Sequence, residues 1–139
     1  MPLIYRVMKV ENGRPKVGAA SSCLGARVGE DIQPDQDGNV HPGTGGMSVV
    51  ADPNGLPDAL VPVMYRSFLP HARSKDTNRR IWKMGQGPFV SGPIADALEF
   101  RVDPKHNEHG FVEPGKVMPI SGYQGALAAT RDKWDEVKA

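Results

Sequence analysis

Short stretches in which apolar and polar residues alternate run through much of the chain, and they predict a fold rich in short β-strands. The first stretch, residues 2–10, places Leu3, Tyr5 and Val7 at alternate positions, as expected for a strand with one buried face. Glycine, proline and asparagine separate the stretches, which favours turns between them. Four further strands are expected, at 47–51, 81–84, 98–102 and 109–114.

Other stretches follow a helical pattern or a mixed one. Residues 94–98 predict a single helical turn, and residues 59–68 fit either a short helix or a short strand. From Ser121 to Val137 apolar residues recur at steps of three and four, which predicts a packing helix that Ser121 caps. The buried stripe of this helix should contain Tyr123, Leu127 and Trp134.

Composition narrows the class of protein. With 139 residues the chain is expected to form one domain, residues 1–139, with a hydrophobic core of its own. The formal net charge of +1 gives no argument for a nucleic acid or an anionic membrane as partner. The single cysteine, Cys23, excludes an internal disulfide and favours a reducing compartment. No apolar run is long enough to cross a membrane, and no secretory signal peptide is recognisable.

The most unusual stretch is the glycine-rich run that leads into the strand expected at 47–51. It consists of His41-Pro42-Gly43-Thr44-Gly45-Gly46-Met47-Ser48-Val49-Val50. Glycine tolerates positive φ, and successive N–H groups in such a turn can form an anion-binding concavity. Two interpretations stay open: a tight turn that enters a strand, or a backbone cradle for a ligand, completed by the Ser48 hydroxyl. The run has neither the lysine of a P-loop nor the spacing of a dinucleotide fingerprint.

A few other residues stand out because of their chemistry. Arg6 has the opposite parity from the apolar residues of the first strand, so it is either solvated or a fixed guanidinium for phosphate. Cys23 has no base partner nearby in the sequence, and we expect a small buried apolar group rather than a nucleophile. His106 and His109 are three positions apart but lack further ligands at a suitable spacing, so no metal site is predicted.

Three pieces of the chain, taken in order, resemble a known family. The first strand carries Tyr5-Arg6, and the middle piece runs from Asp37 to Val49. The most specific part of the middle piece is Thr44-Gly45-Gly46-Met47-Ser48-Val49. The late piece is His109-Gly110-Phe111-Val112-Glu113-Pro114-Gly115-Lys116-Val117-Met118, followed by the expected helix. These pieces resemble the small toxins of the type VI secretion system that have an ADP-ribosyltransferase-like fold. The resemblance spans nearly the whole chain.

The resemblance implies an α+β fold, in which a split, two-sheet β core clasps NAD and a few helices flank it, one of them at the C-terminus. By their match to the motifs, the expected catalytic residues are Arg6, Ser48, His109 and Glu113. The residues expected to contact NAD are Arg6, Thr44, Gly45, Gly46 and Ser48. In chemical terms, an arginine neutralises the pyrophosphate, a serine orients the ribose, and a carboxylate stabilises the cation that forms at the ribose.

The implied function is that of a bacterial toxin with NAD as its substrate, acting as an ADP-ribosyltransferase or an NAD glycohydrolase. The same resemblance implies action in the cytoplasm of producer or target cells, export without a signal peptide, a macromolecular acceptor, and neutralisation by an immunity or antitoxin protein. Two other functions stay open. One is a non-enzymatic protein-binding module on the same fold. The other is a toxin directed at nucleic acid, for which only the basic segment 73–80 argues.

Overall fold

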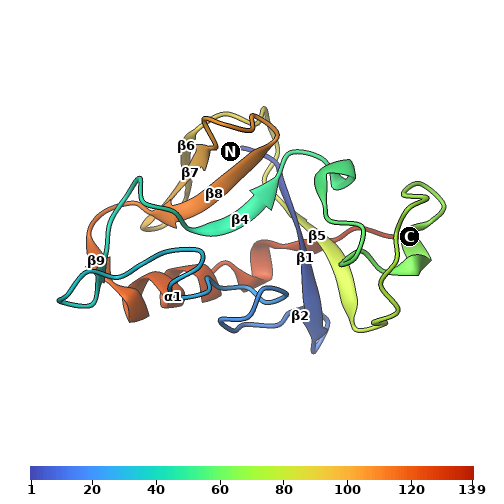
Figure 1. Ribbon diagram of the computed structural model, residues 1–139, viewed down its shortest axis with the longest axis horizontal. Helices are drawn as coiled ribbons and strands as arrows, with labels where there is room; N and C mark the ends of the chain where they lie inside the picture. Colours follow the sequence, from blue (N-terminus) through green and yellow to red (C-terminus); the bar gives the residue numbers. More distant parts are fainter.

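One strongly curled antiparallel sheet dominates the computed structural model, which describes all residues, 1–139 (Figure 1). Its strands are β1 (Ile4–Glu11), β2 (Arg14–Pro15), β4 (Met47–Val50), β5 (Arg79–Met84), β6 (Gly92–Ala95), β7 (Leu98–Val102), β8 (His109–Pro114) and β10 (Asp135–Glu136). Neighbouring strands follow the order β10-β5-β1-β4-β8-β7-β6, and β2 pairs with the end of β1. All five strands predicted from the alternating pattern are therefore confirmed.

A second, two-stranded sheet and one α-helix complete the fold. The small sheet pairs β3 (Asn39–Val40) with β9 (Met118–Pro119), and α1 (Ile120–Ala128) follows directly. Three short 3-10 helices lie in the connections: η1 (Pro53–Gly55), η2 (Val63–Tyr65) and η3 (Arg131–Lys133). The predicted α+β class is confirmed. No helix combines the length and the apolar character needed to cross a membrane.

The C-terminal helix is shorter than the sequence pattern predicts. It ends at Ala128, and its N-cap position is Pro119 rather than Ser121, which lies inside the helix. The chain then forms η3 and pairs with β5 as β10, because its backbone finds hydrogen-bond partners at the sheet edge. Trp134 is nevertheless buried, as are the two helix residues predicted with it, Tyr123 and Leu127.

Two other local predictions differ from the structure. Residues 94–98 form no helical turn: β6 ends at Ala95, and a tight hairpin leads into β7 with Ala97 at φ 62°. Residues 59–68 form turns around η2 rather than a regular helix or strand. In both stretches the turn residues outweigh the short apolar pattern.

One face of the sheet is buried, and the other face is covered at β1, β4 and β5, which gives the molecule two apolar clusters. The larger cluster joins one face to α1 and the loop before β3, and it includes Ile4, Met8 and Tyr123. The smaller cluster joins Val7 on the other face to the segment between β4 and β5. The first strand therefore has apolar residues on both faces, not on the single face that alternation predicts. Arg6 lies on the face of the larger cluster, buried among its neighbours.

The last two glycines of the glycine-rich run, Gly45 and Gly46, pack against backbone rather than facing open space. A Cβ on Gly46 would lie 2.4 Å from the Val112 carbonyl oxygen and 2.9 Å from the Tyr123 hydroxyl. A Cβ on Gly45 would lie 2.3 Å from the Asp31 carbonyl oxygen, and its φ is +127°. The Tyr123 hydroxyl completes this contact, because it accepts from Met47 N at 3.0 Å and donates to the Val112 carbonyl. Gly46 thus permits close approach of β4, β8 and α1, and Gly45 permits close approach of the loop at Asp31.

We predict that Gly46→Ala lowers the free energy of unfolding by about 1–3 kcal/mol, because the added methyl overlaps a backbone oxygen in a packed core. Gly125→Ala is the matched control, since this α1 position has open space around it. The control should raise stability by about 0.5–1 kcal/mol, as alanine does in helices. Urea unfolding of both variants checks this. A Gly46→Ala protein as stable as the parent would show that the glycine is not required by packing.

Candidate functional site

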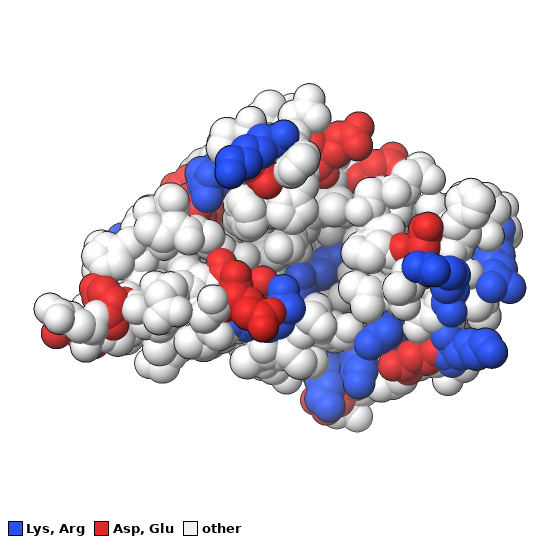
Figure 2. All heavy atoms as spheres, in the orientation of Figure 1, with Lys and Arg blue, Asp and Glu red and all other residues white.

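A cavity opens where β1 and β4 separate. The two strands pair only at Tyr5 and Val50. Neither of the next two antiparallel pairs, Arg6 with Val49 and Val7 with Ser48, forms, and Figure 1 shows the end of β4 meeting β1 at a wide angle. The cavity has a volume of about 280 Å³, and Figure 2 shows a hollow in this region with basic atoms in its floor. Its lining consists of Tyr5, Arg6, Val7, Ser21, Arg27, Ser48, Val49, Val50, Gly55, Leu56, Pro57, Leu60 and His109.

The Arg6 side chain fills the gap between the two strands. Its Nη1 donates to the Ser48 carbonyl at 2.8 Å, and its Nε donates to the Cys23 carbonyl at 3.2 Å. Its Nη2 donates to the carbonyls of Ser21 and Cys23 at 3.0 Å each, and lies 3.5 Å from that of Gly25. Of the two N–H groups on Nη1, only one has a protein acceptor.

Arg6 is a buried charge without a carboxylate partner. The residue is 7 % exposed, and every protein group that it bonds is a neutral carbonyl. Burial lowers the pKa of its guanidinium to about 10, which still leaves it protonated at neutral pH. By contrast, Arg27 pairs with Glu30 at 2.6 Å and with Asp31 at 3.2 Å. Arg6 thus donates no hydrogen bond to a carboxylate, although the nearby charge of Asp31 partly offsets the lowering of its pKa. Its positive charge at the cavity favours an anionic group there.

Ser48 and His109 reach the same cavity from two adjacent strands. On β4 and β8 the register pairs Ser48 with Phe111 and Val50 with His109, so Ser48 and His109 are diagonal neighbours on one face. The Ser48 hydroxyl makes no hydrogen bond within the protein, whereas its carbonyl accepts from Arg6. The structure thus brings together three of the predicted catalytic residues: Arg6, Ser48 and His109.

Glu113, the fourth predicted catalytic residue, does not line the cavity. Its side chain is 7 % exposed and accepts from Arg101 Nε at 3.0 Å. The guanidinium of Arg101 also lies over the Phe111 ring, 5.2 Å from its centre. Glu113 lies on the same face of β8 as His109, but its carboxylate is not at the cavity with the other three predicted catalytic residues. The cause is the cross-strand ion pair, which holds the carboxylate against β7.

The predicted cofactor contacts in the glycine-rich run also lie apart from the cavity. Thr44, Gly45 and Gly46 are not among its lining residues, and the Thr44 hydroxyl donates to the His41 carbonyl at 2.7 Å. Of that run, only Ser48 and the two valines after it reach the cavity. The run therefore acts in the structure as a tight, closely packed turn that leads into β4.

Several residues of the site escaped the sequence analysis. Arg27 stands in an irregular loop, and the opposite wall comes from the segment after β4, at Leu56, Pro57 and Leu60. Asp103, at the end of β7, contacts His109 through its side chain. Of these residues, only Asp103 could have been predicted from the sequence, because a hairpin between the strands expected at 98–102 and 109–114 places Asp103 opposite His109.

Other potential sites receive less support from the geometry. In the basic segment 73–80, Arg79 pairs with Asp76 at 3.6 Å and Arg80 with Glu136 at 3.8 Å. No three His, Cys, Asp or Glu residues cluster closely enough to hold a metal ion. Cys23 is buried, as predicted. Comparison of the chain with models of known protein families, with curated proteins and with solved structures finds no match.

We predict that Arg6→Met lowers the free energy of unfolding by about 3 kcal/mol or more, because it leaves several buried carbonyls without a donor. Arg73→Met is the control, since Arg73 is exposed and its side chain makes no hydrogen bond; its effect should stay within about 0.5 kcal/mol. Thermal and urea unfolding measure both. An Arg6→Met protein with parental stability would mean that the guanidinium does not hold the loop.

Proposed function

We propose that the chain is a bacterial toxin that binds NAD in the cavity between β1 and β4 and cleaves the bond between nicotinamide and ribose. The observation that carries this proposal is the meeting of Arg6, Ser48 and His109 at one cavity. They come from three separate strands, β1, β4 and β8. Each also matches a motif of the ADP-ribosyltransferase-like toxins that the sequence resembles.

The cavity suits one half of a dinucleotide in charge and in size. Arg6 offers a fixed positive charge to the pyrophosphate, and Ser48 offers a hydroxyl to the ribose. Tyr5 and Leu56 give the lining an apolar part for the nicotinamide ring. The volume of about 280 Å³ is close to the lower end of roughly 300–1,000 Å³ for small-molecule pockets, which fits the nicotinamide half alone.

The separation of β1 and β4 supports the finer fold assignment, an ADP-ribosyltransferase-like split β core. The strands share one residue pair and then part beside the cavity, as a split core requires. Glu113 has no catalytic role in this proposal, because Arg101 holds its carboxylate away from the cavity. The residues assigned to NAD are therefore Arg6 for the pyrophosphate, Ser48 for the ribose and His109 beside the reacting bond.

The biological setting follows from the resemblance alone. We propose that the toxin transfers ADP-ribose to a macromolecular acceptor or to water in the cytoplasm of a target cell. An immunity or antitoxin protein would protect the producer. Expression of the chain in a bacterium, with growth compared for the parent and the Ser48→Ala variant at equal protein level, tests the toxic activity.

NAD binding provides the direct biochemical test. Calorimetric titration should show saturable binding of NAD to the purified protein, and Ser48→Ala should weaken it about tenfold, the equivalent of one hydrogen bond of about 1.4 kcal/mol. Ser67→Ala is the matched control, since this exposed serine lies away from the cavity. The control should bind NAD as the parent does.

Release of free nicotinamide, followed by chromatography, separates an enzyme from a binding module. The proposal expects release with the parent protein and a reduced rate with Ser48→Ala. Saturable binding without any release would favour the non-enzymatic module on the same fold. Absence of binding would contradict the proposal as a whole.

A further inference from the structure

The His109 imidazole is held from two sides at the wall of the cavity. Its Nδ1 lies 3.3 Å from Asp103 Oδ2. The ring packs edge-on against Phe111, with centroids 4.9 Å apart and planes at 86°. Its other nitrogen, Nε2, has no hydrogen-bond partner in the protein, and His109 is itself part of the cavity lining. The free ring nitrogen is thus the one available to a ligand.

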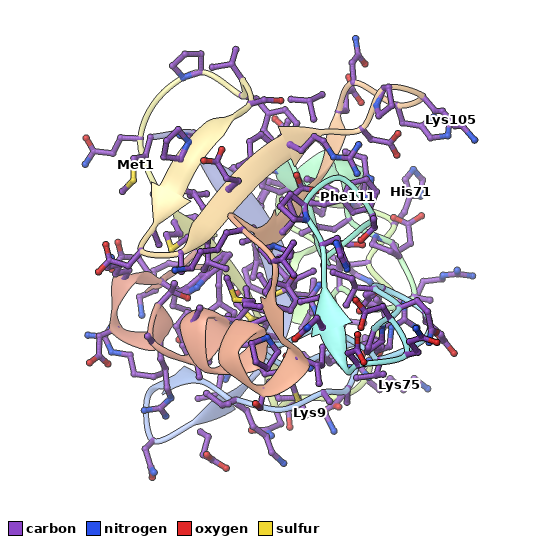
Figure 3. All side chains as sticks on the ribbon, turned by 90° about the vertical axis from the view of Figure 1, so that its left-hand side faces the viewer. Met1, Lys9, His71, Lys75, Lys105 and Phe111 are labelled. Carbon is purple, nitrogen blue, oxygen red and sulfur yellow. The ribbon has the colours of Figure 1, made fainter.

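The Asp103 carboxylate is also held in place by hydrogen bonds. Its Oδ1 accepts from Lys105 N at 2.9 Å, and its backbone N–H donates to the His109 carbonyl at 2.8 Å. The bond from the Lys105 amide, followed by that from His109, holds the pKa of this carboxyl below its usual range. Figure 3 shows Lys105 pointing outward at the tip of the loop between β7 and β8. The Asp103 side chain, 15 % exposed, lies at the base of the same loop.

An ionised carboxylate beside Nδ1 determines which ring nitrogen carries the proton. The carboxylate accepts hydrogen bonds and donates none, so it favours the neutral tautomer with the proton on Nδ1. The lone pair of the neutral ring then lies on Nε2. This is the arrangement of a histidine that a carboxylate orients for general base catalysis.

No other neutral base occupies the cavity wall. The lining has no carboxylate, and its two arginines are cationic. The remaining polar side chains are the hydroxyls of Tyr5, Ser21 and Ser48, which are weak bases. His109 is therefore the side chain of this cavity that offers a basic nitrogen with a free lone pair.

We propose that Asp103 is a positioning residue that makes His109 the proton acceptor of the cavity, an inference that rests on the proposed NAD chemistry. The bond between nicotinamide and ribose C1′ breaks, and its electron pair leaves with nicotinamide. The oxygen of an acceptor hydroxyl or of water bonds to C1′, and its proton passes to His109 Nε2. The products are ADP-ribose joined to that oxygen, nicotinamide and one proton, which the imidazolium later releases to solvent.

The tautomer of His109 tests, without NAD, whether Asp103 holds the proton on Nδ1 of His109. Nitrogen-15 spectra of histidine-labelled protein at pH 8, above the ordinary histidine pKa of about 6.5, report the protonation of each ring nitrogen. His109→Gln identifies the signals among the four histidines. We expect Nδ1 protonated and Nε2 free in the parent. A proton on Nε2 instead would overturn the inference, whatever the protein does with NAD.

Kinetics test the action of Asp103 through His109. His109→Gln should slow nicotinamide release about a hundredfold, as loss of a general base does, and Asp103→Asn at least tenfold. The double variant should be no slower than His109→Gln, since the two residues act as a unit. Asparagine keeps an acceptor for Lys105 N, so the turn is retained. Affinity for NAD should stay within about threefold of the parent.

Asp35→Asn is the matched control for the kinetics. Asp35 also accepts backbone N–H groups in a turn, and its Oδ2 lies 2.7 Å from His41 Nε2, but neither residue lines the cavity. This variant should release nicotinamide at the parental rate. Parental turnover by Asp103→Asn, or losses that add in the double variant, would overturn the role of Asp103. Failure of the parent to bind NAD would instead refute the proposed function, and the tautomer spectrum separates the two results.

Discussion

The guanidinium of Arg6 is the group on which both the irregular part of the chain and the cavity depend. Residues 16–38 form turns and isolated bridges rather than regular strands, so many of their carbonyls lack a partner in a sheet. The Arg6 guanidinium donates hydrogen bonds to three of these carbonyls, those of Ser21, Cys23 and Gly25, and also to the carbonyl of Ser48. A rigid fork of donors suits this task, whereas the single ammonium of a lysine could not reach carbonyls on both sides.

This use of Arg6 couples the fold to the site. The same side chain that replaces the missing strand pairing between β1 and β4 places a positive charge beside the cavity that the separation creates. Ser48 is positioned through its backbone by Arg6, and His109 through its ring by Asp103 and Phe111. The side chains that we expect to contact the ligand thus lie on β-strands and at the ends of hairpins, and these rigid elements fix the orientation of each side chain.

Much of the sheet could be predicted from the sequence, because alternation is a local property that survives folding. The site was only partly predictable. The motifs selected Arg6, Ser48 and His109, which line one cavity, but Glu113 meets Arg101 through the register of two strands, which no local pattern reveals. The helical steps after residue 128 were misleading, since pairing with β5 outweighs them. The glycine-rich run was ambiguous because tight backbone packing and ligand binding both require glycine.

The central claim is that NAD binds between β1 and β4. Two-dimensional amide spectra of nitrogen-15-labelled protein, recorded during titration with NAD, test it most directly because they locate the ligand without assuming any activity. The account predicts progressive, saturable shifts confined to residues around the cavity, among them Ser48, Gly55 and His109, with little change in α1. Unchanged spectra, or shifts that gather at another surface and leave these residues unaffected, would contradict it.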